Sequence, residues 1–207
     1  MIISASRRTD IPAFFSEWFE TRLAEGCAIA RNPFNPGQYK QIGLSPSDID
    51  AFVFWTKNAR PMLDRCGNRL REYCHYYLYT ITGYGERIEP NVPGSDYTLK
   101  TIKMLRDAGL ERDGLVWRYD PVFFSEQFTP AWHQENFRTL AGLLKGYTDT
   151  CILSFIDKYD NIQKSCKSLR DPLQCFQSEQ LLEWLRPIVN IAGDHGIRVQ
   201  TCSELVD

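Results

Sequence analysis

Residues 51–83, AFVFWTKNARPMLDRCGNRLREYCHYYLYTITG, carry the pattern on which the predicted fold depends. The runs AFVFWT and HYYLYTITG are apolar and rich in β-branched and aromatic residues, as buried strands are. Between them, a helix is predicted from about Pro61 to Glu72, with the proline suited to its first turn. A strand, a helix and a second strand in this order indicate a parallel βαβ unit.

The same alternation runs through the rest of the chain. Further helices are predicted at Phe14–Leu23, Thr98–Leu110, Thr129–Gly146 and Ser178–Gly196. Residues 39–44 look like a hairpin strand, and residues 157–177 predict a loop with short helical turns. Strand-like runs are Ile2–Ser6, Cys27–Arg31, Ala51–Thr56, His75–Gly83, Gly114–Tyr119, Asp149–Ile156 and Ile197–Cys202. We therefore expect one α/β domain over residues 1–207 with mostly parallel strands.

The composition argues against several classes of protein. With 207 residues, of which 43% are hydrophobic and 24% charged, the chain can bury one globular core. A net charge of −2 does not favour a nucleic-acid partner. The chain has neither a membrane-spanning run nor the form of a signal peptide, so we expect a cytoplasmic protein. The seven cysteines are odd in number and contain no C-x-x-C pair, which argues against a disulfide framework.

Polar and charged groups follow one strand after another. Because the carboxyl ends of parallel strands share one face, and ligands bind there, we expect these groups to surround a common site. Aromatic residues Trp55, Trp117 and Tyr119 accompany them. The expected mouth of the sheet contains Arg7, Arg8, Asp10, Thr56, Lys57, Asn58, Tyr84, Arg118, Asp120, Asp157 and Glu204.

The residue types at this face suggest roles. Arginine forks and Lys57 suit a carboxylate or phosphate, although they equally suit ion pairs with the nearby aspartates. Asp120 is a candidate general base if its pKa is raised, or else an ionised arginine partner. Lys57 is a candidate Schiff-base or general-base lysine, or a charge clamp. With Asp157, these two form the predicted catalytic set.

The remaining reactive residues lie elsewhere in the pattern. His75 begins a strand, His133 lies in a helix and His195 precedes a strand, so no histidine-based mechanism is expected. Cys202 follows a strand at the expected active face and is a candidate ligand or thiol. The glycines of ITGYG suggest a close backbone approach to a ligand.

Several motifs together resemble the family of domain of unknown function 1848. In chain order they are SASRRTDIPAF, RNPFNP, VFWTKN followed by PML, TITGYG followed by IEPNVP, WRYDP and SFIDKY, from about Ile2 to Cys202. RNPFNP adds Asn32 to the predicted binding residues. The resemblance implies a partial or complete TIM-like (βα) barrel of the radical-SAM type in a mostly bacterial family.

The resemblance also implies cofactors for a full-length protein. A cysteine-rich segment near the family's C-terminus would hold a [4Fe–4S] cluster, which cleaves S-adenosylmethionine. This chain has no such segment, so we expect either that it is truncated relative to the family or that the protein has lost the cluster. No cofactor is assigned to it, and we expect an open or incomplete barrel. The exposed strand edge of such a barrel predicts a dimer.

The leading functional prediction is a radical-SAM-like barrel protein that binds an anionic or ring-containing small molecule. Arg7, Arg8 and Arg118 would hold the anion, Asp120 and Asp157 would orient groups or move a proton, and Trp55, Tyr84 and Tyr119 would stack on a ring. One alternative is a cluster-free hydrolase or lyase that uses either a divalent metal at Asp10, Asp120 and Asp157 or carboxylates alone. Others are a non-catalytic nucleotide or nucleic-acid binding module and an inactive fragment.

Overall fold

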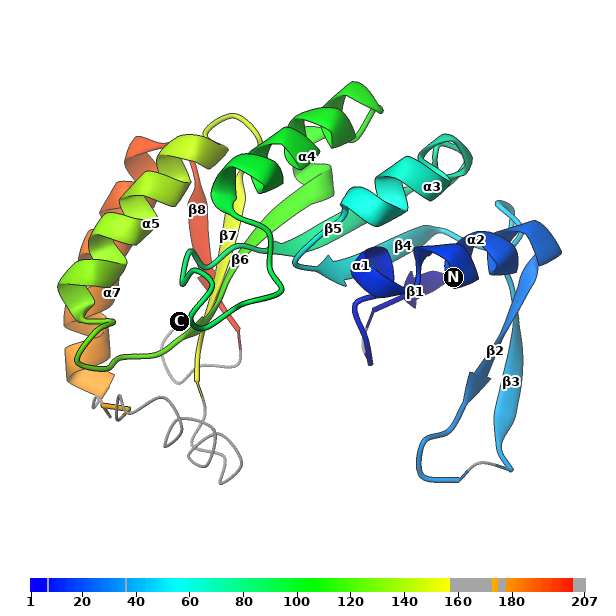
Figure 1. Ribbon diagram of the computed structural model, residues 1–207, viewed down its shortest axis with the longest axis horizontal. Coiled ribbons are helices and arrows are strands. Elements are labelled where there is room, and N and C mark those ends of the chain that lie inside the picture. The colour runs from blue at the N-terminus through cyan, green and yellow to red at the C-terminus, as the bar shows by residue number, and fades with distance from the viewer. Residues whose placement is uncertain (7, 36, 157–172, 175–177, 203–207) are drawn as a thin grey trace. The chain divides into compact units, whose positions relative to one another are not determined.

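The chain forms an α/β fold with a six-stranded parallel sheet, as the strand and helix alternation predicted. The computed structural model describes residues 1–6, 8–35, 37–156, 173–174 and 178–202. The sheet order is β1-β4-β5-β6-β7-β8 (Figure 1). These strands are β1 (Ile2–Ser4), β4 (Ala51–Thr56), β5 (His75–Thr80), β6 (Leu115–Val122), β7 (Thr150–Phe155) and β8 (Arg198–Thr201).

The chain divides into two compact units. The first comprises Met1–Tyr79 and Asp96–Leu115, and the second Thr80–Ser95 and Val116–Asp207. Among the described residues, no helix has the length and apolar character needed to cross a membrane. The single domain expected from the sequence stays a prediction.

In the first unit, aromatic side chains join the helices to the sheet. Its helices are α1 (Ile11–Phe14), α2 (Ser16–Glu25), α3 (Arg60–Leu70) and most of α4 (Ser95–Asp107). Phe19 of α2 meets Phe52 and Phe54 of β4 edge to face, with ring centroids 5.3 and 5.5 Å apart. Because β4 alternates, these two rings share one face of the strand while Trp55 is exposed on the other.

One strand prediction needs correction. Cys27–Arg31 forms β2, which pairs antiparallel with β3 (Tyr39–Gly43) in a separate two-stranded sheet and not with the main sheet. The connection of residues 32–38 is too short for the crossover that parallel neighbours need, so the two strands form a hairpin. Much of it is solvent-exposed, and Phe34 in the turn is 95% exposed.

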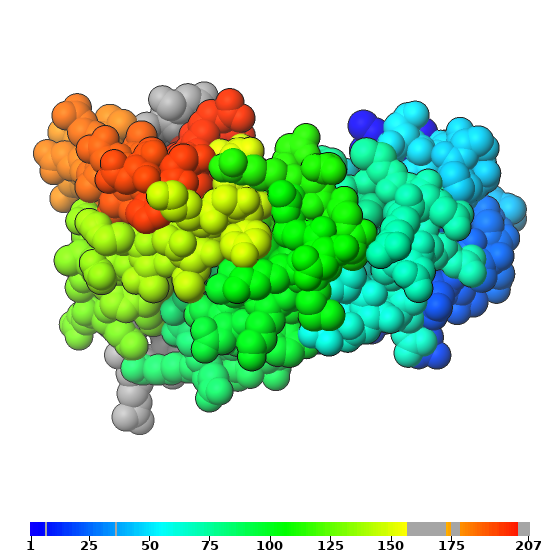
Figure 2. All heavy atoms as spheres, turned by 90° about the horizontal axis from the view of Figure 1, so that it is seen from above, coloured from blue at the N-terminus to red at the C-terminus, as the bar shows by residue number. Residues whose placement is uncertain are grey.

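The second unit has its own aromatic core. Trp117 of β6 stacks on Phe137 of α5 (Pro130–Leu144) with a centroid separation of 4.6 Å. As predicted, Thr129 caps α5, its hydroxyl accepting a hydrogen bond from the backbone N–H of Trp132 at 3.2 Å. Helix α7 (Ser178–Asp194) packs against α5, and the two helices form part of one surface in Figure 2.

The WRYDP segment lies inside β6 instead of following it, which corrects the sequence prediction. Trp117 and Tyr119 are buried, whereas Arg118 and Asp120 alternate onto the opposite face of the strand. The pairing of β6 with β7 continues to Val122 after a register irregularity. Trp117 therefore belongs to the core, and Arg118 and Asp120 are placed on a face of the sheet.

A glycine of the ITGYG motif makes room for a side chain of its own unit. Gly83 has a φ of 74°, and a Cβ atom there would collide with Oδ1 of Asn136 on α5. Nδ2 of Asn136 donates a hydrogen bond of 2.7 Å to the carbonyl oxygen of Thr82. The motif suggested a close approach of the backbone to a ligand, whereas the structure shows the backbone of Gly83 close to Asn136 of α5.

Gly83→Ala is expected to lower the free energy of unfolding by about 2–4 kcal/mol, because it adds overpacking to left-handed strain. Gly85→Ala is the matched control, since Gly85 has a similar φ of 77° but nothing within 4 Å of its Cβ position. The control should lose about 1–2 kcal/mol from strain alone. Urea unfolding of both variants measures the difference, and equal losses would contradict the packing argument.

Candidate functional site

Asp10 joins two loops at the carboxyl ends of the strands in the first unit. Its Oδ1 accepts a hydrogen bond from the backbone N–H of Ala13, and its Oδ2 accepts one from that of Lys57, both at 2.9 Å. The first bond caps α1, and the second ties the loop after β1 to the loop after β4. Each carboxylate oxygen therefore accepts a bond from a backbone N–H group, and the second bond fixes the position of the Lys57 backbone.

The loop after β4 is held by further side chains. Thr56 Oγ1 accepts a bond of 2.9 Å from the N–H of Asn58, and Asn58 Oδ1 accepts one of 3.1 Å from the N–H of Arg60. The hydroxyl of Tyr79 on β5 accepts a bond of 3.2 Å from the N–H of Ala59. Burial raises the pKa of Tyr79, so this hydroxyl is neutral. Predicted residues Thr56 and Asn58 thus shape the loop.

Other predicted residues of the first unit are more dispersed. Arg8 is exposed, and its Nη1 donates a bond of 3.0 Å to the carbonyl oxygen of Arg31 at the end of β2. Asn32 lies in the hairpin turn, where its Nδ2 donates to Gln38 Oε1 at 2.8 Å. Trp55 has an exposed ring. Predicted residues Arg7, Asp157 and Glu204 lie outside the described residues.

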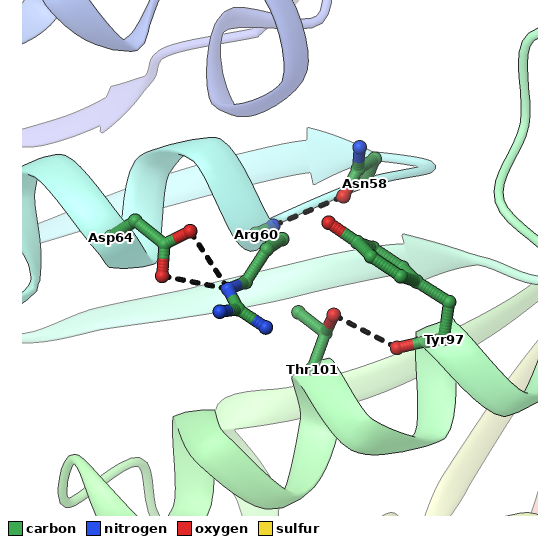
Figure 3. A network of polar contacts seen from close by, with 5 residues as sticks. All are labelled: Asn58, Arg60, Asp64, Tyr97 and Thr101. Carbon is green, nitrogen blue, oxygen red and sulfur yellow. Dashed lines mark hydrogen bonds and ion pairs between the residues drawn. The ribbon is translucent and has the colours of Figure 1, made fainter.

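Arg60 and Tyr97 reach the same end of this unit, and sequence reasoning missed them. Arg60 Nε donates to both carboxylate oxygens of Asp64, at 2.6 and 2.8 Å, and that bond raises the pKa of Arg60. Tyr97, in the first turn of α4, directs its hydroxyl toward Asn58 (Figure 3). A helix that follows a parallel strand begins near that strand's carboxyl end. The place of Tyr97 directly before a predicted helix could therefore have marked it as a site residue.

In the second unit, Arg118 and Asp120 form an ion pair on the face of β6. The side chains are only 14% and 17% exposed, respectively. Burial lowers the pKa of Arg118, and a negative charge on the nearby Cys202 sulfur would act in the opposite direction. Cys202 is exposed just after β8, where its backbone N–H donates to the carbonyl of Leu153 at 3.0 Å. The predicted residues Arg118 and Asp120 thus lie close to the candidate thiol of Cys202.

The predicted stacking residues Tyr84 and Tyr119 are buried, with exposed fractions of 7% and 1%. The Tyr84 ring stacks on Phe123 and Trp132 at centroid distances of 4.7 and 5.7 Å. Its hydroxyl donates to the carbonyl oxygen of Pro121 at 2.7 Å. Both rings therefore pack within the core of the second unit, whereas the sequence analysis predicted that they would stack on a ring of the substrate.

A buried histidine organises the polar groups of this core. His133 Nε2 donates to the carbonyl of Phe123 at 2.8 Å, so Nδ1 accepts from the hydroxyl of Tyr119 at 2.7 Å. That hydroxyl in turn accepts from Nδ2 of Asn136 at 2.9 Å. Burial lowers the pKa of His133 to about 4, which keeps the ring neutral at pH 7.

A cleft of about 790 Å³ lies at the other end of β5, beside His75 and Cys74. As predicted, His75 begins this strand; its Nδ1 donates to the carbonyl of Tyr73 at 3.0 Å. Volume alone favours the cleft as a ligand site. Strand direction favours the carboxyl ends of the strands for catalysis. In the second unit, the ion pair of Arg118 and Asp120 lies on the face of β6 towards that end, with Asp120 two residues before the last residue of the strand.

His133 should make stability fall in mild acid. Its ordinary pKa of 6.5 applies to the unfolded chain, whereas the folded value is about 4. The unfolded state therefore binds the proton first, and up to about 3 kcal/mol of stability is lost as pH falls from 6.5 towards 4. Urea unfolding across this range should show a smaller loss for His133→Gln. Arg138→Gln, at an exposed position of α5, should lose as much stability as the wild type. If the free energy of unfolding falls equally with pH in the wild type and both variants, the loss does not come from His133.

Comparisons with known proteins identify the family alone. No curated protein and no solved structure matches the chain. A family model, described as domain of unknown function (DUF1848), matches residues 2–207. This match covers the strand-end motifs of both units, including Asp10, Lys57, Arg118 and Asp120. The chain therefore belongs to the DUF1848 family.

Proposed function

We propose that the chain binds a small anionic molecule at the polar face and carboxyl ends of its parallel strands, with Arg118 as the residue that holds the anion. The observation that carries this proposal is the burial of a charged guanidinium on the face of β6. Burial lowers the pKa of Arg118, so a bound anion that favours the charged form would stabilise the guanidinium. A carboxylate or phosphate on the planar guanidinium would add charge-assisted bonds to the one that Asp120 makes.

Asp120 would orient the guanidinium and the ligand together. One of its oxygens contacts Nη2 of Arg118, which leaves the other to accept a bond from a hydroxyl or amine of the ligand. In a catalytic reaction the same carboxylate is the proposed proton acceptor. Lys57 and Asp157 keep their proposed catalytic roles on the strength of residue type and position in the motifs.

Radical chemistry stays a proposal that rests on the family resemblance. Among the described residues, no group of three or more His, Cys, Asp or Glu side chains is placed to hold a metal ion. These residues do not fit a [4Fe–4S] cluster, and no step is assigned to one. S-adenosylmethionine is nevertheless a suitable probe, because its carboxylate is the kind of group that Arg118 would bind.

The metal-dependent alternative is less well supported. It requires Asp10, whose two carboxylate oxygens each accept a backbone hydrogen bond at 2.9 Å. A cation at Asp10 would compete with the cap of α1 and with the link to Lys57.

Arg118→Met should weaken the binding of S-adenosylmethionine and of inorganic phosphate by about 10- to 100-fold, the worth of a charge-assisted hydrogen bond. Arg118→Lys should fall between this variant and the wild type, because it keeps the charge and loses the fork. Isothermal titration calorimetry measures all three.

Arg138→Met is the matched control, since Arg138 is an exposed arginine on α5 whose Nε lies 3.9 Å from Glu135. It should bind both probes as the wild type does. Circular dichroism checks that each variant is folded. The proposal fails if the wild type binds neither probe, or if Arg118→Met binds them as tightly as the control.

A further inference from the structure

The β2–β3 hairpin carries large apolar side chains on its surface. Phe34 is 95% exposed, Tyr39 70% and Ile29 56%. Among the described residues, neither of the two aromatic rings contacts another ring. The hairpin extends from the end of α2, with its turn at the far end (Figure 1). Because a two-stranded hairpin alone is only marginally stable in water, exposed apolar groups on one indicate a surface that a partner covers.

The register of the hairpin places a cation beside a ring. Arg31 pairs with Tyr39 and Ile29 pairs with Gln41, so these four side chains lie on one face. Lys40 lies on the opposite face, since successive residues of a strand alternate. The exposed ring of Tyr39 and the guanidinium of Arg31 therefore offer a flat surface and a positive charge to the same ligand.

Hydrogen bonds within the turn hold the backbone at Phe34. The N–H of Phe34 donates a bond of 2.9 Å to Oδ1 of Asn32, and the N–H of Asn32 donates one of 2.9 Å to the carbonyl oxygen of Gln38. Oδ1 of Asn35 accepts a bond of 3.2 Å from the N–H of Gly37. The turn is thus formed before a ligand arrives, which reduces the entropy that binding at this ring would cost.

The charge of the hairpin is entirely positive. Residues 26–47 contain no Asp or Glu, whereas they contain Arg31 and Lys40. Arg8 adds a third cation, because its Nη1 donates a bond of 3.0 Å to the carbonyl oxygen of Arg31. All three residues are exposed, and none has an ion pair in the part of the chain that the structure describes. The net charge of −2 for the whole chain therefore coexists with a local cationic surface, which attracts a polyanion.

The remaining side chains of the hairpin distinguish between polyanions. Asn35, Gln38 and Gln41 are exposed close to the two aromatic residues. A lipid bilayer would leave these amides without hydrogen-bond partners, whereas the edges of unpaired bases offer both donors and acceptors. Exposed rings stack on bases that are free of a duplex, and an acidic peptide has no base to offer them.

From these features we infer that the β2–β3 hairpin binds a single-stranded nucleic acid. The three cations contact its phosphates, and the rings of Phe34 and Tyr39 stack on its bases. The hairpin belongs to the first unit, whereas Arg118 belongs to the second. The inference therefore does not rest on the proposed function.

Fluorescence anisotropy with labelled oligo(dT) and oligo(U) tests the inference on the whole chain. Binding is expected, and the slope of log K against log salt should be about −2, as for three phosphate contacts to a single strand. Tighter binding of one oligonucleotide would identify the ligand as DNA or as RNA. A blunt DNA duplex should bind at least about fivefold more weakly, because its bases are not free to stack.

Anionic vesicles and poly-L-glutamate test the other classes of polyanion. Binding of either in place of the oligonucleotides overturns the inference. Equal binding of the duplex and the single strands also overturns it, as does the absence of any binding to the oligonucleotides.

Variants separate stacking from charge. Phe34→Ala and Tyr39→Ala should each weaken binding about tenfold, and Lys40→Gln should make the salt slope shallower by about 0.7. Phe14→Ala on α1 and Lys100→Gln on α4 are the matched controls, since both residues are exposed outside the hairpin. They should bind as the wild type does, and circular dichroism checks that every variant is folded. Wild-type affinity in both ring variants would place the oligonucleotide elsewhere and overturn the inference.

Discussion

The carboxylate of Asp10 accepts one hydrogen bond from the amide of Ala13 and another from the amide of Lys57, 47 residues away. Through these bonds a single side chain caps a helix of only four residues and sets the path of the loop after β4. Asn58 follows in that loop and Arg60 begins α3, so their positions depend on the same carboxylate. Asp10, which the sequence predicts as a substrate-binding residue or, in the alternative, a metal ligand, therefore also has a structural role.

Strand β6 imposes the corresponding constraint in the second unit. Its alternation sends Trp117 and Tyr119 into the core against α5 and places Arg118 and Asp120 on the other face. Because core and charge share one strand, a change of register by one residue would bury the ion pair and expose the indole. The proposed binding residue is thus held in place by the packing of its immediate neighbours.

The helices and parallel strands could be predicted because their patterns are local. Phe52 and Phe54 belong to an apolar run that forms a buried strand, and Thr129 marks a helix start that the structure confirms. The apolar run Cys27–Arg31 does not by itself specify its partner, but the hairpin strand predicted at residues 39–44 is confirmed by the antiparallel pairing of β2 with β3. A short turn between two strands was the better guide.

The site was harder to predict, because the same residue type serves packing and chemistry. Tyr84 and Tyr119 look like stacking residues in a motif, yet their rings contact the unit's own aromatic side chains. His133 was set aside as a helical residue, and its ring proved to be the acceptor for Tyr119. Such contacts join residues more than ten positions apart, and no local pattern encodes them.

The β2–β3 hairpin has one more consequence, which concerns how the chain tolerates change in length. Its two ends meet where the backbone N–H of Leu44 donates to the carbonyl oxygen of Gly26 at 2.8 Å. Meanwhile, β1 pairs directly with β4, from Ile2 opposite Ala51 to Ser4 opposite Val53. The hairpin is therefore a side excursion whose shortening or exchange would leave the register of these strands intact, and it is a natural place for a peptide to be grafted.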